Sequence, residues 1–199
     1  MNSQYEYAWS ISDDHFIRGN IPMTKEEIRS IALGKLRIQK HHIVVDIGAG
    51  TGSVSIEAGF RAKNGNVYAI ERKKEGIELI KKNIERFNIK NITVIEGTAP
   101  RAFDGVGDFV DRIFIGGSGG RLEDIITKSH KLLVNHGRMV MNFITIENLH
   151  TALDVLRGLN YNDIDVVHVN ISKNKKIDAS LTMMQAENPI YIVSTEKVE

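Results

Sequence analysis

Three glycines in the segment VVDIGAGTGSVSIEAG (residues 44–59) have the spacing of a ligand-binding turn. Gly48, Gly50 and Gly52 follow an apolar run and precede a helical pattern that begins near Ser53. Glycine permits positive φ angles and lets a ligand approach the main chain without meeting a Cβ. Free amides at the start of the next helix favour a carboxylate or a phosphate. The segment therefore predicts a turn that binds an anionic group through its backbone.

The residues around this turn indicate which ligand it binds. Ser53 stands where a dinucleotide fingerprint needs its last glycine, and no G-K-[ST] follows. Glu71 closes the next strand 19 residues after Gly52, where a carboxylate can accept hydrogen bonds from ribose hydroxyls. Asp46 lies two residues before Gly48, where it either meets a cationic amine or satisfies amides of the loop. A ribose and an amino-acid moiety without a pyrophosphate describe S-adenosylmethionine.

The elements that position these residues follow the order of an α/β fold. Apolar runs alternate with helical patterns, which indicates a mostly parallel sheet. Thr24 with Glu27 three positions later forms a capping box, which predicts a helix from about Lys25. Thr24 therefore has two interpretations, a helix cap and a ligand contact. Seven strands are expected, at residues 42–48, 66–71, 91–97, 111–117, 137–144, 163–170 and 188–195.

No linker or internal repeat divides the chain, so residues 1–199 are expected to form one domain. Residues 1–23 are expected to lie over the ligand pocket. The polar segment 172–180 reads as a connection between the last two strands. Met183 and Met184 are expected to fill the core.

Composition narrows the classes of partner. The 26 basic and 25 acidic side chains nearly cancel, so we expect no nucleic acid and no membrane as partners. The absence of cysteine excludes disulfides and thiolate metal sites, and the seven histidines lack metal-binding spacing, so no protein-bound metal is expected. The N-terminus does not have the pattern of a signal peptide, and no apolar run approaches the ~20 residues of a membrane span. These features favour a cytoplasmic protein.

The segment EGTAP (96–100) after the third strand, taken with the glycine turn and the strand pattern, resembles the class I S-adenosylmethionine-dependent methyltransferases. That likeness implies a Rossmann-like sheet of seven strands with helices on both faces and an antiparallel last strand. In that fold Thr98 and Ala99 would lie beside the adenine, with their main chain reading its edge.

Three longer segments carry a closer likeness: DDHFIRGNIPMTKEEIR (13–29), DRIFIGGSGG (111–120) and TMMQAENPIYIV (182–193). Together they resemble the CbiT family of decarboxylating cobalt-precorrin-6B methyltransferases. The resemblance implies methylation of carbon 15 of a corrinoid, loss of carbon dioxide from the acetate on carbon 12, and a homotetramer. Cobalt would arrive inside the substrate. A separate partner methyltransferase could supply another methylation, as in fused relatives.

The resemblance also implies site residues. Cofactor contacts would come from Thr24, Gly48, Ala49, Gly50, Thr51, Gly52, Glu71 and Ala99. The transferred methyl and the macrocycle would be bordered by Gly117, Ser118, Gly119 and Gly120. Basic side chains flanking these segments would recognise substrate carboxylates; they are Arg18, Lys25, Arg101 and Arg121. No general base is named, because the conjugated macrocycle can receive the electrons released on decarboxylation.

Two other functions stay open at this point. A methyltransferase acting on RNA or protein would use the same fold and cofactor, although the sequence shows no basic stripe and no N-P-P-Y after the fourth strand. A non-catalytic nucleotide-binding module or a dehydrogenase would share the doubly wound sheet, although Ser53 speaks against pyrophosphate binding.

Overall fold

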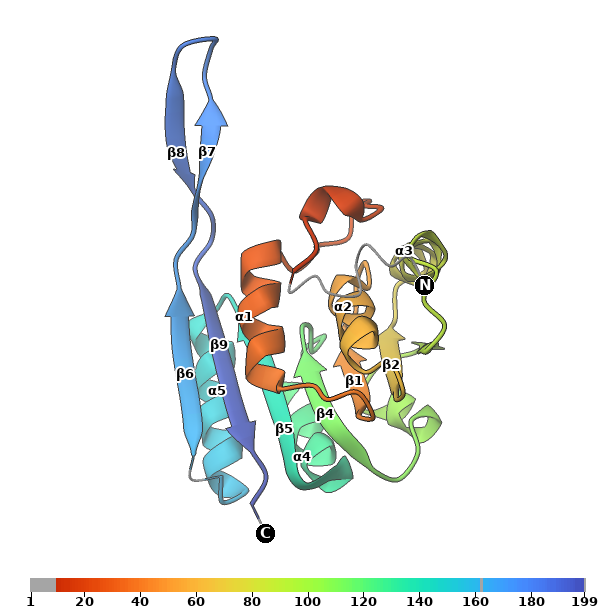
Figure 1. Cartoon of the computed structure of the whole chain (residues 1–199). Helices are drawn as coiled ribbons and strands as arrows, with labels where there is room; N and C mark the ends of the chain where they lie inside the picture. The colour runs from red at the N-terminus through yellow and green to blue at the C-terminus, as the bar shows by residue number, and fades with distance from the viewer. Residues whose placement is uncertain (1–9, 162, 199) are drawn as a thin grey trace.

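A seven-stranded sheet between two layers of helices organises the computed structural model, which describes residues 10–161 and 163–198 (Figure 1). The strand order is β3-β2-β1-β4-β5-β9-β6. Five neighbouring strands are parallel, and β9 runs antiparallel to both β5 and β6, as the sequence predicts. The bounds are β1 (Ile43–Ile47), β2 (Asn66–Glu71), β3 (Ile92–Glu96), β4 (Val110–Ile115), β5 (Leu133–Phe143), β6 (Ile164–Val169) and β9 (Ile190–Glu196).

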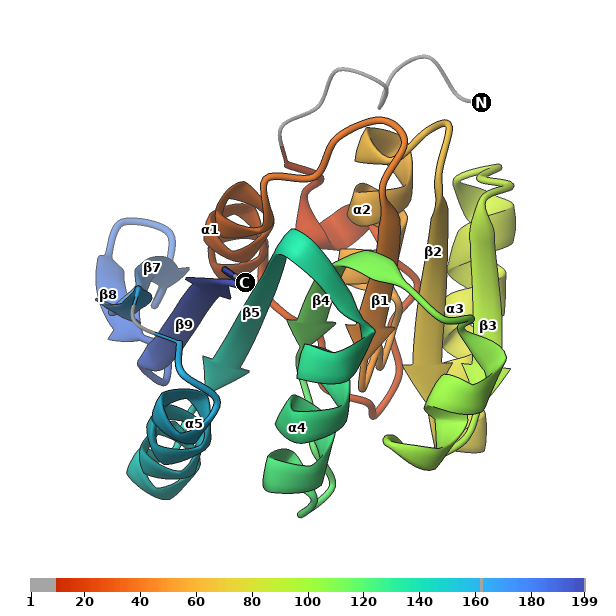
Figure 2. The same cartoon turned by 90° about the horizontal axis from the view of Figure 1, so that it is seen from below.

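Helices cover both faces of this sheet (Figure 2). α1 (Glu26–Leu36), α2 (Ser53–Arg61) and α3 (Lys74–Arg86) lie on one face, and α4 (Leu122–Leu132) and α5 (Ile146–Gly158) lie on the other. Successive strand residues alternate between the faces. Val44 accordingly packs with α1 and α2, whereas Val45 packs with α4. Two short 3-10 turns complete the helical elements, η1 (Asp13–His15) and η2 (Arg101–Gly105).

The carboxyl ends of β1 and β4 form the switch point of the sheet. From β1 the chain builds outward through β2 to β3, and it then returns to β4 on the other side of β1. Connections that leave a strand pair in opposite directions open a crevice between the two strand ends, and ligands of open α/β sheets bind there. The fold thus directs attention to the loops after β1 and β4.

A two-stranded arm stands where the sequence predicts only a connection. β7 (Ser172–Lys176) and β8 (Thr182–Ala186) pair antiparallel and project away from the sheet (Figure 1). The prediction of a plain connection is wrong because the side chain of Asp178 accepts hydrogen bonds from the amides of Ser180 and Leu181, which closes the turn locally. Residues on such an arm have no sheet face to pack against.

Met183 and Met184 lie on this arm, so their assignment to the core is also wrong. Their exposed fractions are 46% and 63%. The prediction rested on residue type alone, because methionine is a common core residue.

The start of α1 differs from the expected capping box. Lys25 is the N-cap residue, the helix begins at Glu26, and no side chain caps it. The carbonyl of Thr24 accepts a hydrogen bond from the guanidinium of Arg29, and the carboxylate of Glu27 pairs with Lys173 of β7 at 2.8 Å. Because Lys25 occupies the N-cap position, Thr24 precedes the cap by one residue and the predicted box does not form. Among the described residues, no helix is both long and apolar enough to cross a bilayer.

Candidate active site

A cavity of about 350 Å³ opens at the carboxyl ends of the central strands. Its size falls in the range of ~300–1,000 Å³ that is common for small-molecule sites. The glycine turn after β1, Glu71 at the end of β2 and the loop after β4 all contribute to its wall. The cavity therefore lies at the switch point of the sheet, where the topology places a ligand.

The glycine turn has a backbone that a side chain would disturb. Gly48, Gly50 and Gly52 have φ angles of 72°, 58° and 79°, the left-handed region that glycine adopts without strain. A Cβ on Gly48 would lie 2.8 Å from the backbone nitrogen of Gly117, and a Cβ on Gly50 would lie 2.9 Å from the carbonyl oxygen of Pro22. The turn is thus closely flanked by two other loops of the site.

Glu71 fixes the turn through its carboxylate. Its Oε2 accepts a hydrogen bond from the amide of Gly50 at 2.9 Å. Its Oε1 accepts from the amides of Arg72 at 2.9 Å and Lys73 at 2.8 Å. A carboxylate offers about four acceptor positions, so one position remains for a ligand hydroxyl.

Asp46 is buried beneath the turn instead of lining the cavity. Its side chain is 1% exposed, and its Oδ2 accepts a hydrogen bond from the hydroxyl of Ser55 at 2.5 Å. Oδ1 has no partner among the described residues. Burial raises the pKa of Asp46 to about 7, and the nearby charge of Glu71 acts in the same direction. Asp46 thus does not line the cavity, and its hydrogen bond is to Ser55 of α2 and not to an amide of the loop.

A strap of residues 10–24 crosses the cavity, with Ile21, Pro22, Met23 and Thr24 in its wall. Asn83 of α3 holds the strap. This fully buried side chain accepts from the amide of Ile17 at 2.8 Å and donates to the carbonyls of Ile17 at 3.1 Å and Thr51 at 2.9 Å. Thr51 belongs to the glycine turn, so one amide group joins strap and turn.

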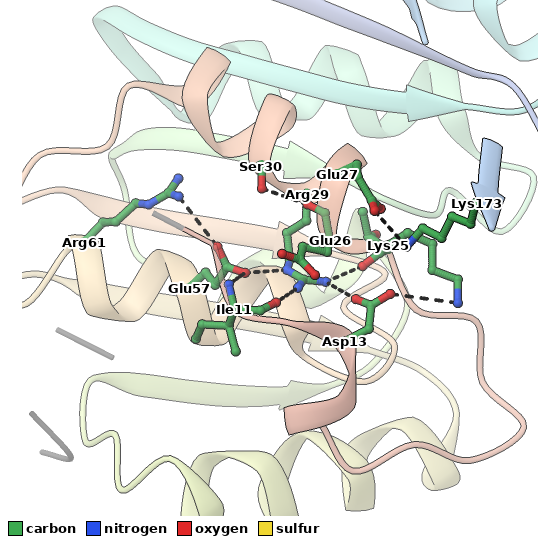
Figure 3. Close-up of polar contacts among 11 residues, drawn as sticks. Ile11, Asp13, Lys25, Glu26, Glu27, Arg29, Ser30, Glu57, Arg61 and Lys173 are labelled. Atoms are coloured by element: carbon green, nitrogen blue, oxygen red, sulfur yellow. Dashed lines mark hydrogen bonds and ion pairs between the residues drawn. The ribbon is translucent and has the colours of Figure 1, made fainter. Parts of the chain in front are cut away.

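Arg29 of α1 holds the two ends of the same strap (Figure 3). Its guanidinium donates to the carbonyls of Ile11 and Thr24 and to Oδ1 of Asp13 at 3.1 Å. Its Nε donates to the buried carboxylate of Glu57 at 2.6 Å. Arg29 has no exposed surface. Burial raises the pKa of Glu57, and the charge of Arg29 opposes that rise.

The structure brings many of the predicted cofactor and substrate residues together at the cavity. Of the predicted cofactor residues, those that line it are Thr24, Gly48, Ala49, Gly50, Glu71, Thr98 and Ala99. Asp46, Thr51 and Gly52 lie behind the wall. Of the predicted substrate residues, Gly117, Ser118 and Gly119 line the cavity.

The remaining substrate residues do not line it; they are Gly120, Arg18, Lys25, Arg101 and Arg121. Nζ of Lys25 lies 3.9 Å from Oδ2 of Asp13. The guanidinium of Arg121 forms an ion pair with Oδ2 of Asp124 at 3.1 Å. The cations in the wall are instead Arg72 and Lys73, directly after Glu71. Their position directly after Glu71, the residue predicted to bind the ribose, could have identified them from the sequence. Nine of the first 23 residues, 1–9, lie outside the described part of the chain, so the expected N-terminal cover is seen only from residue 10.

Asn142 lines the cavity from the end of β5, and no local pattern in the sequence marks it as a site residue. Asparagine in an apolar strand reads as an ordinary strand residue. Its place at the cavity becomes clear only when β5 is seen between β4 and β9, on the face of the sheet that α1 covers.

The strand order, the antiparallel pairing of β9 and the glycine turn at the switch point define a class I methyltransferase fold. The family model described as the precorrin methyltransferase domain matches residues 15–197, and the chain belongs to this family.

Individual relatives agree with the family match. The chain is 47% identical over 189 residues to a probable cobalt-precorrin-6B C(15)-methyltransferase (decarboxylating) of Sulfurisphaera tokodaii, and the match covers 94% of this chain and 97% of that protein. The crystal structure of a precorrin-6y C5,15-methyltransferase from Geobacter metallireducens superposes with a TM-score of 0.89 at 38% identity, over 96% of this chain and all of that one. A precorrin 8w decarboxylase from Methanobacterium thermoautotrophicum gives 0.86 at 34% identity, over 93% and 98% of the two chains.

Proposed function

We propose that the chain is an S-adenosylmethionine-dependent methyltransferase of cobalamin biosynthesis. It methylates carbon 15 of cobalt-precorrin-6B and removes the acetate carboxyl on carbon 12. The observation that carries the proposal is the cavity in which the glycine turn and Glu71 meet the loop after β4. Relatives with 39% and 47% identity to the chain bear the name of this activity.

The wall of the cavity fits the proposed cofactor. The amides of Gly48 and Gly50 already donate to the carbonyl of Ile70 and to the carboxylate of Glu71. Because the turn carries no side chain at these two positions, the methionine moiety would lie directly against its main chain. The free acceptor position of Glu71 suits a ribose hydroxyl. Thr98 and Ala99 follow β3 on the same side of the cavity and would lie along the adenine edge. Bound S-adenosylmethionine supplies a methyl group whose bond to sulfur breaks with the electron pair left on sulfur, while the accepting ring carbon provides the pair for the new bond.

The protein itself binds and orients the cofactor and the substrate, and it excludes water from the cavity. The strap residues Ile21 to Met23 cover the cofactor side of the cavity, and Ile28, Phe143 and Ile190 give the other side an apolar wall. Holding two carbons in near-attack geometry accelerates a displacement without an acid or a base. The substrate accepts the electron pair of its breaking carbon–carbon bond into the conjugated ring as carbon dioxide leaves, so we assign no general base.

We propose further that the chain works as one domain, that it acts in the cytoplasm and that it assembles as a homotetramer. The arm supports assembly, because Ile177, Leu181 and Met184 expose 62%, 57% and 63% of their surface there. Light scattering during size-exclusion chromatography measures the mass of the assembly and tests the proposed homotetramer. A monomer at micromolar concentration would contradict the assembly and leave the proposed activity standing.

Incubation with methyl-labelled S-adenosylmethionine and cobalt-precorrin-6B tests the activity. Mass analysis of the product should show one labelled methyl gained and one carboxyl lost. A parallel titration with NAD tests the alternative of a dehydrogenase or nucleotide-binding module. An assay with RNA as the methyl acceptor tests the alternative of an RNA methyltransferase. Binding of NAD without binding of S-adenosylmethionine, or methyl transfer to RNA without transfer to the corrinoid, would contradict the proposal.

A further inference from the structure

Asn142 places an unpaired amide at the cavity. It is the second-last residue of β5 and lines the cavity wall. Its Oδ1 and Nδ2 are both buried, and neither has a hydrogen-bond partner among the described residues. A buried amide without partners destabilises a folded protein, so its presence requires an explanation.

The amide faces the side of the sheet on which α1 and the strap lie. Met141 and Phe143 pack in the core cluster that contains α4 and α5, and side chains alternate along a strand. Asn142 therefore points the same way as Val140, which packs with α1. Ile115 of β4 pairs with Met141, so the next residue of β4, Gly116, stands beside Asn142. Gly116 has no side chain that could pair with the amide.

The cavity has two parts of different character. The cofactor part lies over β1, β2 and β3, and its charged side chains are Glu71, Arg72 and Lys73. The part over β4, β5 and β9, here called the acceptor part, is lined by Thr24, Ile28, residues 116–119, Ile125, residues 142–144 and Ile190. Among the described residues that line the cavity, the charged side chain that reaches the acceptor part is Arg72, whose guanidinium would lie 3.2 Å from a Cβ on Gly119. The uncharged polar side chains of the acceptor part are those of Thr24, Ser118 and Asn142.

We propose that the side chain of Asn142 turns into the cavity when the substrate binds, and that its Nδ2 then donates a hydrogen bond to the carboxylate that is lost. This inference rests on the proposed function. When the carbon–carbon bond to the carboxylate breaks, carbon dioxide leaves and the electron pair passes into the conjugated ring. Negative charge thus moves away from the carboxylate in the transition state.

A neutral donor suits this reaction better than a cation does. An ion pair would stabilise the carboxylate before the bond breaks and lose that interaction as the charge leaves, which raises the barrier. The amide orients the group, and Ile28 and Ile190 on the same face of the sheet keep it poorly solvated.

Two substitutions and one control test the inference. Asn142→Leu preserves size and removes the unpaired amide, so the melting temperature of the cofactor-free protein should rise by roughly 2–4 °C. The same variant should lose about tenfold in the rate of carbon dioxide release while its affinity for S-adenosylmethionine stays within about twofold. Asn142→Asp places a negative charge against the carboxylate and should raise KM for the corrinoid further. Asn148→Leu, at an exposed position of α5, is the matched control and should change neither activity nor affinity.

The outcomes separate this inference from the proposed function. Wild-type turnover of cobalt-precorrin-6B with undiminished carbon dioxide release by Asn142→Leu overturns the assignment of Asn142 alone. A fall in melting temperature in Asn142→Leu would show that the amide is satisfied by structural water, which also overturns it. A wild-type protein that leaves the corrinoid unchanged overturns the proposed function together with this assignment.

Discussion

The carboxylate of Glu71 accepts a hydrogen bond from the backbone amide of Gly50 at 2.9 Å, which ties the end of β2 to the turn after β1. The same carboxylate holds the amides of Arg72 and Lys73. One side chain thus shapes the floor of the cavity and keeps one acceptor position open. Its loss should affect the turn and the ligand together.

Glu71→Ala should weaken binding of S-adenosylmethionine by about 1.5–3 kcal/mol, or roughly ten- to a hundredfold, because hydrogen bonds to a charged acceptor disappear. Isothermal titration calorimetry measures the change. Glu78→Gln, on the exposed face of α3, is the control and should bind as the wild type does. Unchanged affinity in Glu71→Ala would contradict the ribose assignment.

Gly50→Val should abolish cofactor binding. The new side chain meets a φ of 58° and the carbonyl of Pro22 at 2.9 Å from its Cβ, so it strains the turn and pushes against the strap. Gly34→Ala is the control, because a Cβ there has nothing within 4 Å and the residue lies in α1; it should be stabilising by about 0.5–1 kcal/mol. Circular dichroism and calorimetry follow fold and binding. A folded Gly50→Val protein with normal affinity would refute the role of the turn.

Arg29→Met should destabilise the protein by about 3–5 kcal/mol, since it leaves the carboxylate of Glu57 buried without its main partner. Urea unfolding gives the difference. Adding Glu57→Gln to the variant should recover part of the loss, because the uncompensated charge is then gone. Arg157→Met removes an exposed pair with Asp154 and should cost less than about 1 kcal/mol. Equal losses of unfolding free energy in Arg29→Met and Arg157→Met would show that the buried cluster stabilises the protein no more than an exposed ion pair does.

Asp46→Asn should flatten the dependence of stability on pH between about 4 and 7. The folded state raises the pKa of Asp46 from 3.8 to about 7, so it favours the protonated carboxyl. The contribution of this group is present in full below the unfolded pKa and is lost as pH rises through the folded pKa. Urea unfolding at several pH values checks the slope. The variant should also be the more stable protein at pH 8, and a wild-type advantage there would contradict the direction of the shift.

Local patterns sufficed for the seven strands of the sheet and for the turn, since apolar runs and glycine spacing are short-range signals. The sequence could not place Arg29 or Asn83, because each contacts chain segments 5 to 66 residues away that only the fold brings near. The four basic residues chosen from flanking segments missed the cavity for the same reason: nearness in sequence did not tell which way each side chain turns. Asn142 lacked any local signal, whereas Arg72 and Lys73 stood next to a residue already singled out.

The shared amide of Asn83 makes the strap and the glycine turn one mechanical unit. Lifting the strap at Ile17 would break two hydrogen bonds of Asn83 and leave the one to the carbonyl of Thr51. Any opening of the strap above a bound cofactor would therefore act on the same side chain that braces the turn beneath it.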